Sequence, residues 1–339
     1  MDRRPTIKDV AQAADVSMGT VSRVAANSAV VSPETRLRVE DAMRKLGYVP
    51  NIAARTMRTN RTKIVGLLIP DLANTVFIQL AKAAERTLGL SGYTLFLYSS
   101  ERSSRREIDF IHLASQYRMD GLIVSLSDET NQSVIQALAT MECPVVLLDR
   151  DTPLVADVVF SEHAEAMQRV TAHLIELGHR RIALITAPLG IRPGRERVNG
   201  YRAALKEAGL PVDETLIGHD YQTTKYGLSK SLELLRQPNR PTAIIAGGDE
   251  IFYGVLRAVR QLNLAVPGDV SIVGADNRML SDVVSPMITI IDRDMELVGD
   301  SAADLLVKRM SGALTSEPVH VHLPSEVMLR SSTGRPRSG

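Results

Sequence analysis

A short segment near the N-terminus concentrates side chains that can bind a polyanion. From Val16 to Val24 it reads Val-Ser-Met-Gly-Thr-Val-Ser-Arg-Val, so hydroxyl groups and an arginine are interspersed with valines. Hydroxyl and guanidinium groups donate hydrogen bonds to phosphate oxygens, and an arginine also reaches acceptor atoms on a base edge. In a helix the valines would form one buried face. The residues expected to point outward are Met18, Gly19, Thr20 and Arg23.

Helices must position this segment, and the first fifty residues contain the signals for them. Thr6 followed by Asp9 predicts a capping box, and Ser17 can cap a second helix. Ser32 before Pro33 marks the start of a third helix. Two helices joined by a tight turn form a helix-turn-helix, whose second helix reads DNA. Small helical bundles of other function show the same alternation, so the spacing alone leaves both interpretations open.

The composition is that of a globular protein with about two domains. The chain has 339 residues, of which 44% are hydrophobic and 23% charged. Residues 1–63 contain 12 Lys and Arg against 6 Asp and Glu, a net charge of +6 that leaves −5 for the remainder. A basic N-terminal part on an acidic body indicates a polyanionic partner for the former, although a basic face is often only solvated.

Membrane, secreted and disulfide-rich proteins are excluded. The longest apolar runs, such as Ile64–Ile69, are far shorter than the ~18 residues of a membrane span. The first residues lack the apolar stretch of a secretory signal, so we expect a cytoplasmic protein. Cys143 is the only cysteine, which excludes an intramolecular disulfide and a thiolate metal cluster.

From residue 64 onward the pattern predicts an α/β body. Short apolar segments alternate with amphipathic helices of roughly 12 to 18 residues, which is typical of parallel sheets. A break near 149–157 divides the body into two similar α/β subdomains, and 289–309 would cross back to the first; the tail 331–339 is expected to be mobile. The expected strands are Ile64–Ile69, Thr94–Tyr98, Gly121–Ser125, Pro144–Leu148, Val158–Phe160, Arg181–Thr186, Leu216–His219, Thr242–Ala246 and Val270–Val273.

Specific motifs occur along almost the whole chain. The N-terminal ones are Thr6–Ala11, Val16–Ser17, Thr20–Val24, Val31–Arg36 and Leu46–Asn51. Those in the body are Val65–Asp71, Asp120–Ile123, Glu176–Ala183, Arg197–Tyr201 and Val266–Gly274. Together they resemble the LacI/GalR family of bacterial transcription repressors.

The resemblance implies an all-α helix-turn-helix head on a body like that of periplasmic sugar-binding proteins. It further implies a homodimer that binds a palindromic operator in double-stranded DNA and is controlled by a small effector: a sugar, sugar acid or sugar phosphate. The expected boundaries are 1–49 for the DNA-binding domain, 50–62 for a hinge helix and linker, and 63–339 for the effector-binding and dimerisation domain. Within the last, subdomain 1 spans about 63–160 and 291–320, and subdomain 2 about 161–290 and 321–330.

The family pattern also assigns DNA contacts. Met18 and Gly19 are the variable base-reading positions, and Arg23 contacts a base edge. Met57 stands where the family usually has a leucine that wedges between base steps, and Asp15 stands where it usually has a turn glycine. Asp tolerates a left-handed backbone, so the turn should survive. The full set of expected contacts is Thr6, Ser17, Met18, Gly19, Thr20, Ser22, Arg23, Asn27, Asn51, Arg55 and Met57.

The family pattern also implies that an effector binds in loops at the carboxyl ends of the body's strands, and the residues named below are the matching positions. Carboxylates there accept hydrogen bonds from sugar hydroxyls and arginines donate them, although each residue singly could form an ordinary ion pair instead. Gly248, Glu162 with His163, and Ala275 depart from the usual family residues. Arg192, Arg195 and Lys225 could instead favour an acidic or phosphorylated effector. The expected effector residues are Asp71, Asn74, Phe77, Ser125, Arg150, Glu162, Arg197, Asp249 and Asp276.

An enzyme and a solute-binding protein are the two other classes that a chain of this composition could represent. An enzyme is not expected, because the chain lacks nucleophile-elbow, phosphate-loop and zinc-protease motifs. No cofactor or metal is expected either, since His320 and His322 have no obvious further ligands nearby. A solute-binding protein without DNA function is the alternative that residues 64–330 alone would support. The basic N-terminal part and the missing signal peptide favour the regulator.

Overall fold

The structure is a computed structural model that describes residues 5–25, 30–49 and 61–337. It divides into two compact units, Met1–Thr62 and Lys63–Gly339, which we describe separately as the head and the body. In the described ranges, no helix is long and apolar enough to cross a membrane.

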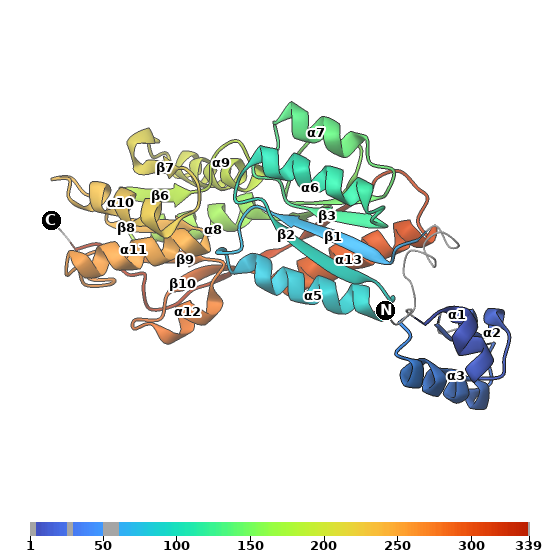
Figure 1. Cartoon of the computed structure of the whole chain (residues 1–339). Coiled ribbons are helices and arrows are strands. Elements are labelled where there is room, and N and C mark those ends of the chain that lie inside the picture. Colours follow the sequence, from blue (N-terminus) through green and yellow to red (C-terminus); the bar gives the residue numbers. More distant parts are fainter. Residues whose placement is uncertain (1–4, 26–29, 50–60, 338–339) are drawn as a thin grey trace. The chain divides into compact units, whose positions relative to one another are not determined.

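The described part of the head contains three helices (Figure 1), which pack around a small apolar core. Val10, Val21 and Val39, one from each helix, have no exposed surface. Val16 and Val24 also pack against this core, as their spacing predicts. The helices are α1 (Ile7–Ala13), α2 (Met18–Ala25) and α3 (Pro33–Leu46).

Each helix of the head begins at the predicted capping residue. Thr6 and Asp9 form the capping box, in which the Thr6 amide donates to the carboxylate at 2.7 Å. The side-chain oxygens of Ser17 and Ser32 accept the backbone N–H three residues later at 3.1 and 3.3 Å. Asp15 adopts the left-handed backbone expected of it, with φ of 50°, and so closes the turn between α1 and α2.

The body contains two six-stranded sheets. All strand pairs are parallel except that of the edge strand β12 with β10. Sheet A consists, in spatial order, of β11 (His320–Leu323), β5 (Asp157–Ser161), β4 (Val145–Leu148), β3 (Gly121–Val124), β1 (Ile64–Ile69) and β2 (Thr94–Ser99). Sheet B consists of β12 (Ser325–Met328), β10 (Thr289–Arg293), β9 (Ser271–Ala275), β8 (Ala243–Gly247), β6 (Ile182–Thr186) and β7 (Ile217–His219).

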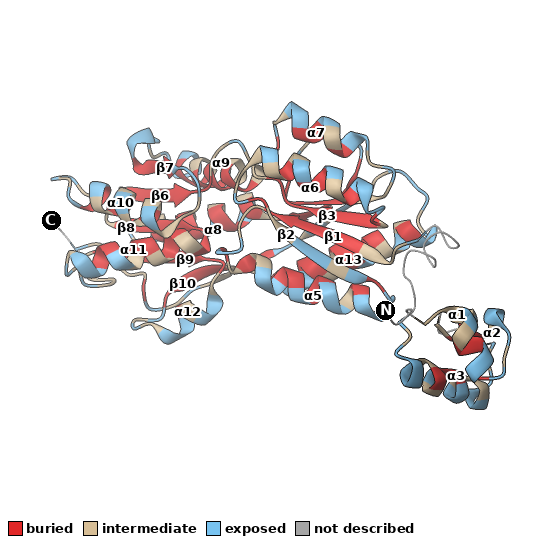
Figure 2. Ribbon diagram, viewed as in Figure 1, coloured by how far each residue is buried: buried red, intermediate tan, exposed pale blue. Residues whose placement is uncertain are grey.

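Helices cover both faces of each sheet, which is why the central strands are continuous apolar runs (Figure 2). One face of sheet A packs against α5 (Val76–Leu90) and α13 (Met295–Ser311), the other against α6 (Ser104–Gln116) and α7 (Gln132–Ala139). Sheet B lies between the pair α8 (His163–Glu176) and α9 (Arg192–Glu207) and the pair α10 (Thr224–Leu235) and α11 (Asp249–Gln261). Two short elements, η1 (Glu214–Leu216) and α12 (Arg278–Val283), complete sheet B's subdomain.

The chain passes between the two subdomains three times. It leaves sheet A after β5, returns after β10, and leaves again between β11 and β12. Glu162, Asp294 and Pro324 are the residues at these three crossings. All nine predicted strands are present, whereas β10, β11 and β12 were not among the expected strands. The segment expected to be only a crossover and helix therefore begins with a strand of sheet B.

The expectation of a mobile tail is wrong for residues 331–337. Ser332 is fully buried, and its carbonyl accepts the Ile272 amide at 3.0 Å while its hydroxyl donates to the Ile272 carbonyl at 2.6 Å. The Gly334 carbonyl lies 2.9 Å from Nε2 of His179. The polar residues of the tail make hydrogen bonds with strands of sheet B. The composition of the tail alone does not reveal this pairing.

Candidate functional site

The outward face of α2 is the first candidate site. Met18 is 53% exposed, and Gly19 and Arg23 are exposed as well. The hydroxyls of Ser17 and Thr20 lie 3.0 Å apart at the start of the helix. The amino end of a helix carries partial positive charge, so hydroxyl donors at this end suit phosphate oxygens.

The other predicted DNA contacts are either engaged within the head, partly buried or outside the described residues. The Thr6 hydroxyl donates to Asp9 at 2.7 Å, so it is engaged in the capping box, and Ser22 is half-buried. A Cβ added to Gly19 would lie 3.5 Å from the Ser17 hydroxyl, which is an ordinary contact distance. Packing therefore does not require a glycine here, but its lack of a side chain lets another molecule approach the backbone of α2 closely. Asn27, Asn51, Arg55 and Met57 lie outside the described residues.

The second candidate site is a cavity of about 90 Å³ between the two subdomains of the body. Residues that follow strands of both sheets line it, for instance Asp71 after β1 and Tyr221 after β7. This is the edge at which open α/β sheets bind ligands. Six of the nine predicted effector residues line the cavity: Asp71, Asn74, Phe77, Ser125, Arg150 and Arg197.

One wall of the cavity is apolar. Phe77 and Leu80 from α5 and Met295 and Val298 from α13 contribute to it, together with Leu148 at the end of β4. Such a wall can pack against the C–H groups of a sugar ring or another small carbon skeleton.

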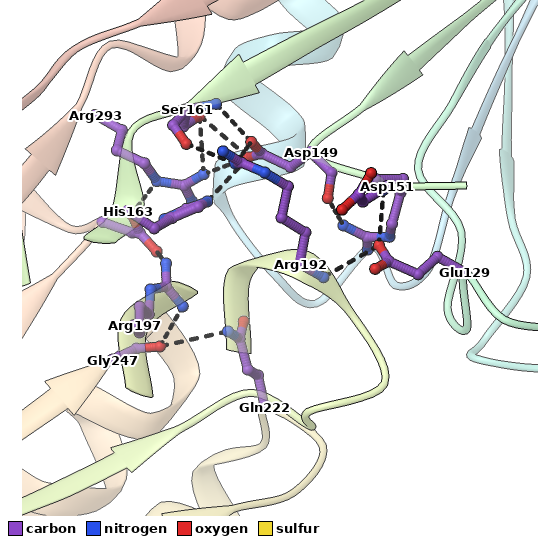
Figure 3. A network of polar contacts seen from close by, with 12 residues as sticks. Glu129, Asp149, Asp151, Ser161, His163, Arg192, Arg197, Gln222, Gly247 and Arg293 are labelled. Carbon is purple, nitrogen blue, oxygen red and sulfur yellow. Dashed lines mark hydrogen bonds and ion pairs between the residues drawn. The ribbon is translucent and has the colours of Figure 1, made fainter. Parts of the chain in front are cut away.

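A buried network of ion pairs also borders the cavity (Figure 3). Arg293, at the end of β10, donates to Asp276 at 2.6 Å and to Asp149 at 3.0 Å. Arg197 donates to Asp276 at 3.2 Å and to the Gly247 carbonyl at 2.5 Å. Because Asp149 follows a strand of sheet A and Asp276 a strand of sheet B, Arg293 joins the two subdomains.

Burial and neighbouring charge set the protonation of this network. Burial opposes ionisation of Asp149, but His163, Arg293 and the Ser161 amide together hold its pKa well below the usual range. The pKa of Asp276 is likewise lowered, since Arg293 and Arg197 outweigh its burial. Burial lowers the pKa of His163 to about 4 although Asp149 lies 3.3 Å away, so the imidazole is neutral at pH 7.

Three predicted effector residues do not line the cavity. Glu162 is half-exposed and pairs with His322 at 2.6 Å. Asp249 is buried and accepts hydrogen bonds from Thr75 and, at 2.6 Å, from Asn277. Asp276 lies behind the cavity wall, where it holds Arg197 and Arg293.

Comparison with known proteins connects both sites to one family. Residues 6–51 match the family described as bacterial regulatory proteins, lacI family, and residues 171–333 match the periplasmic binding protein-like domain. The HTH-type transcriptional regulator DegA of Bacillus subtilis is 31% identical over 97% of this chain and 98% of its own. The chain belongs to the LacI family.

Solved structures of two regulators are similar to almost the whole chain. The transcriptional regulator CelR in complex with cellobiose is 33% identical, with a TM-score of 0.74 over 97% of this chain and 100% of its own. The lac repressor dimer bound to operator and the anti-inducer ONPF is 27% identical, with a TM-score of 0.85 over 98% and 100%. This LacI-family chain is thus a transcriptional regulator with a helix-turn-helix head and a periplasmic-binding-protein-like body, and not an enzyme.

Sequence reasoning missed several residues of this regulator's cavity. Asp149 directly precedes the predicted Arg150, so strand-end position alone could have identified it. Arg293 follows a strand that was not anticipated, and Arg102 and Tyr221 lie in loops without a distinctive motif. Apart from Asp149, these residues are recognisable only once the strand ends of the two sheets are placed on either side of the cavity.

Cross-subdomain contacts also close the rim of the cavity. The buried Glu129, in the loop after β3, accepts the Arg192 amide at 3.1 Å and forms an ion pair with Arg195 at the start of α9. Arg102 donates to the Gln222 carbonyl at 2.9 Å. The two subdomains therefore meet through the chain's own polar groups.

Proposed function

We propose that the protein is a dimeric repressor that binds a palindromic operator through α2 of each head. The exposed face of α2, with Met18, Gly19 and Arg23, carries this proposal. It presents a flexible apolar side chain, a glycine without a side chain, hydroxyl groups and a guanidinium group, which suit a major groove and its flanking phosphates. The lac repressor, similar over its full length, binds operator as a dimer.

DNA footprinting with the full-length protein tests this half of the proposal. Protection of a palindromic sequence near its own or neighbouring genes is expected, with two half-sites protected symmetrically. Affinity should fall steeply as salt rises, because Lys and Arg contacts release counterions from the phosphates. Failure to protect any palindrome would overturn the operator assignment, and with it the repressor.

The hinge makes a second contact in the proposal. Met57 inserts at the centre of the operator and supports only the bent, specific complex. Met57→Ala should weaken specific binding while leaving salt-sensitive binding to random DNA nearly intact, as measured by fluorescence anisotropy on both DNAs. Equal losses on the two DNAs would remove the wedge role.

The body supplies the control. It closes on a hydroxylated small molecule, a sugar or sugar derivative, in the cavity lined by Arg150, Arg197 and Phe77. CelR, which has the same fold, is seen in complex with cellobiose. Closure changes how the two subunits present their heads, so effector and operator binding are coupled.

Thermodynamic reciprocity gives the test of this coupling. A thermal-shift screen of sugars, sugar acids and sugar phosphates first identifies a ligand, because binding to the native state raises stability. That ligand is then titrated into free and operator-bound protein, and the two affinities must differ by the factor by which it changes operator affinity. Arg197→Gln should lower the affinity for the ligand, whereas Arg257→Gln, at an exposed position of α11, should leave it unchanged. Equal ligand affinities with and without operator would contradict the coupling between effector and operator binding.

A further inference from the structure

The charged residues that line the cavity are unequally divided. Four arginines and two aspartates face it, which gives the lining a net charge of +2. The arginines are Arg102, Arg150, Arg197 and Arg293, and the aspartates are Asp71 and Asp149.

The carboxylates beside the cavity already accept hydrogen bonds from the chain itself. Asp71 accepts Arg102 at 2.7 Å and the Ala73 amide at 2.9 Å. Asp149 accepts Arg293 at 3.0 Å and both the amide and the hydroxyl of Ser161 at 2.5 and 3.1 Å. A neutral sugar, whose hydroxyls need acceptors as well as donors, would therefore share these carboxylates with hydrogen bonds that the chain itself makes.

Arg150 differs from the other three arginines of the cavity. It is 4% exposed, and its hydrogen bonds go to neutral carbonyls, from Nε to Leu126 at 2.5 Å and from Nη1 to Asp149 at 2.9 Å. Its Nη2 has no hydrogen-bond partner among residues 5–25, 30–49 and 61–337. A guanidinium group buried without an anion bound to it is costly, which makes this end of the cavity a place for a negative charge.

Nearby acidic groups do not supply that charge directly. Glu129 pairs with Arg195, and Glu107 accepts the Ser127 amide at 2.8 Å. Burial lowers the pKa of Arg150, although the fields of Glu129, Asp149 and Glu107 oppose the shift. Burial also raises the pKa of Glu107, which weakens its value as a counterion.

Hydroxyl donors accompany Arg150 at the cavity wall. Its Nε–H bond to Leu126 holds the guanidinium group against the loop that carries Ser125 and Ser127, and both serines line the cavity. We propose that the effector carries an oxyanion, a carboxylate or a phosphate, which Arg150 and Ser125 bind while the carbon skeleton packs against the apolar wall. This inference rests on the proposed function of the cavity as the effector site.

Matched pairs of neutral and anionic probes test the proposal on full-length protein. Glucose is compared with gluconate and glucose 6-phosphate, and ribose with ribose 5-phosphate, by thermal shift and calorimetry. Inorganic phosphate is the minimal probe, against sodium chloride of equal ionic strength. At least one anionic probe should bind saturably and about tenfold or more tighter than its neutral counterpart, because a built charge site rejects an analogue that lacks the charge. Carboxylate and phosphate probes together show which oxyanion fits.

Variants assign the anion preference to Arg150. Arg150→Gln should abolish the preference, and Arg150→Lys, which keeps the charge but loses the planar fork, should reduce it. Arg257→Gln removes an exposed arginine far along α11 and should leave it unchanged. If Arg150→Gln does not fold, the preference for anionic over neutral probes is compared between the wild type and Arg150→Lys, and this comparison tests the role of Arg150. Tighter binding of the neutral probes, no saturable binding of any anion, or an unchanged preference in both Arg150 variants would overturn the inference.

Operator binding separates this inference from the proposed function. A neutral sugar that binds the cavity and alters operator affinity would overturn the anionic effector and leave the regulated repressor intact. A protein that binds an anionic probe through Arg150 but no operator would overturn the repressor and leave the anion site intact.

Discussion

The head and the body use polar side chains in opposite ways. In the head, the residues that face outward from α2 are exposed, and the serine and threonine hydroxyls near them make short local hydrogen bonds at the helix starts. In the body, arginines and aspartates from separate strand ends are buried and hold one another. Function in the head should therefore be separable from stability, whereas in the body a single substitution should affect both.

The largest expected effect is in the body. Arg293→Met leaves the carboxylates of Asp149 and Asp276 buried without their shared partner, which should cost about 3 to 5 kcal/mol of unfolding free energy. Urea unfolding followed by circular dichroism measures it. The exposed Arg257→Met should change stability by less than about 0.5 kcal/mol. A loss below about 1 kcal/mol for Arg293→Met would show that the network is not what holds this part of the body.

The next effect is a pH dependence confined to the body. His163 has a pKa of about 4 when folded against an ordinary 6.5, so the unfolded chain binds an extra proton between these values. The contribution of His163 should lower stability by up to about 3 kcal/mol as pH drops from 6.5 to 4, and below that range the lowered pKa values of Asp149 and Asp276 cause a further loss. His163→Asn should flatten this part of the curve, while His112→Asn, at an exposed position, should not. An unaltered slope in His163→Asn would assign the proton uptake elsewhere.

A smaller effect is expected at the reading face of the head. Arg23→Ala should weaken operator binding by about 1 to 3 kcal/mol and relax base preference at one position of each half-site. Its thermal unfolding should match that of the wild type, because the side chain is exposed. Arg44→Ala removes the same charge at the far end of α3 and should cause only a weak loss on any DNA. A stability loss in Arg23→Ala as large as its loss in binding would erase the contrast between head and body.

The smallest effect concerns a helix cap. Thr6→Val removes the capping hydroxyl of α1 and should destabilise the head by about 1 kcal/mol. Hydrogen exchange of α1 amides in the full-length protein measures it, with Gln12→Ala on the exposed side of α1 as the control. If exchange is unchanged but DNA affinity drops, the hydroxyl serves DNA rather than the cap.

The same contrast explains what the sequence could predict. Caps, the Asp15 turn and the buried valines of the head depend on neighbours within a few residues, so periodicity and capping rules identified them. In the body, nine strands followed from apolar runs, but β11 and β12, which contain alternating polar residues, were not among the expected strands. Asp276 and Asp249 were chosen as ligands because of their strand-end positions, yet their orientation depends on partners across the cavity. Pairing between residues more than a hundred positions apart leaves no local signal.

The three crossings between the subdomains also determine when the body can finish folding during synthesis. The described helices of the head, α1 to α3, are complete by residue 46, within the first sixth of the chain. Sheet A lacks its edge strand β11 until residue 323, and sheet B lacks β12 until residue 328 and its hydrogen bonds to Ser332 until the tail emerges. On the ribosome the three helices of the head can fold early, whereas both sheets of the body lack an edge strand until residues 323 and 328 have been synthesised. The nascent chain thus has a folded DNA-binding unit before it has a complete controlling domain.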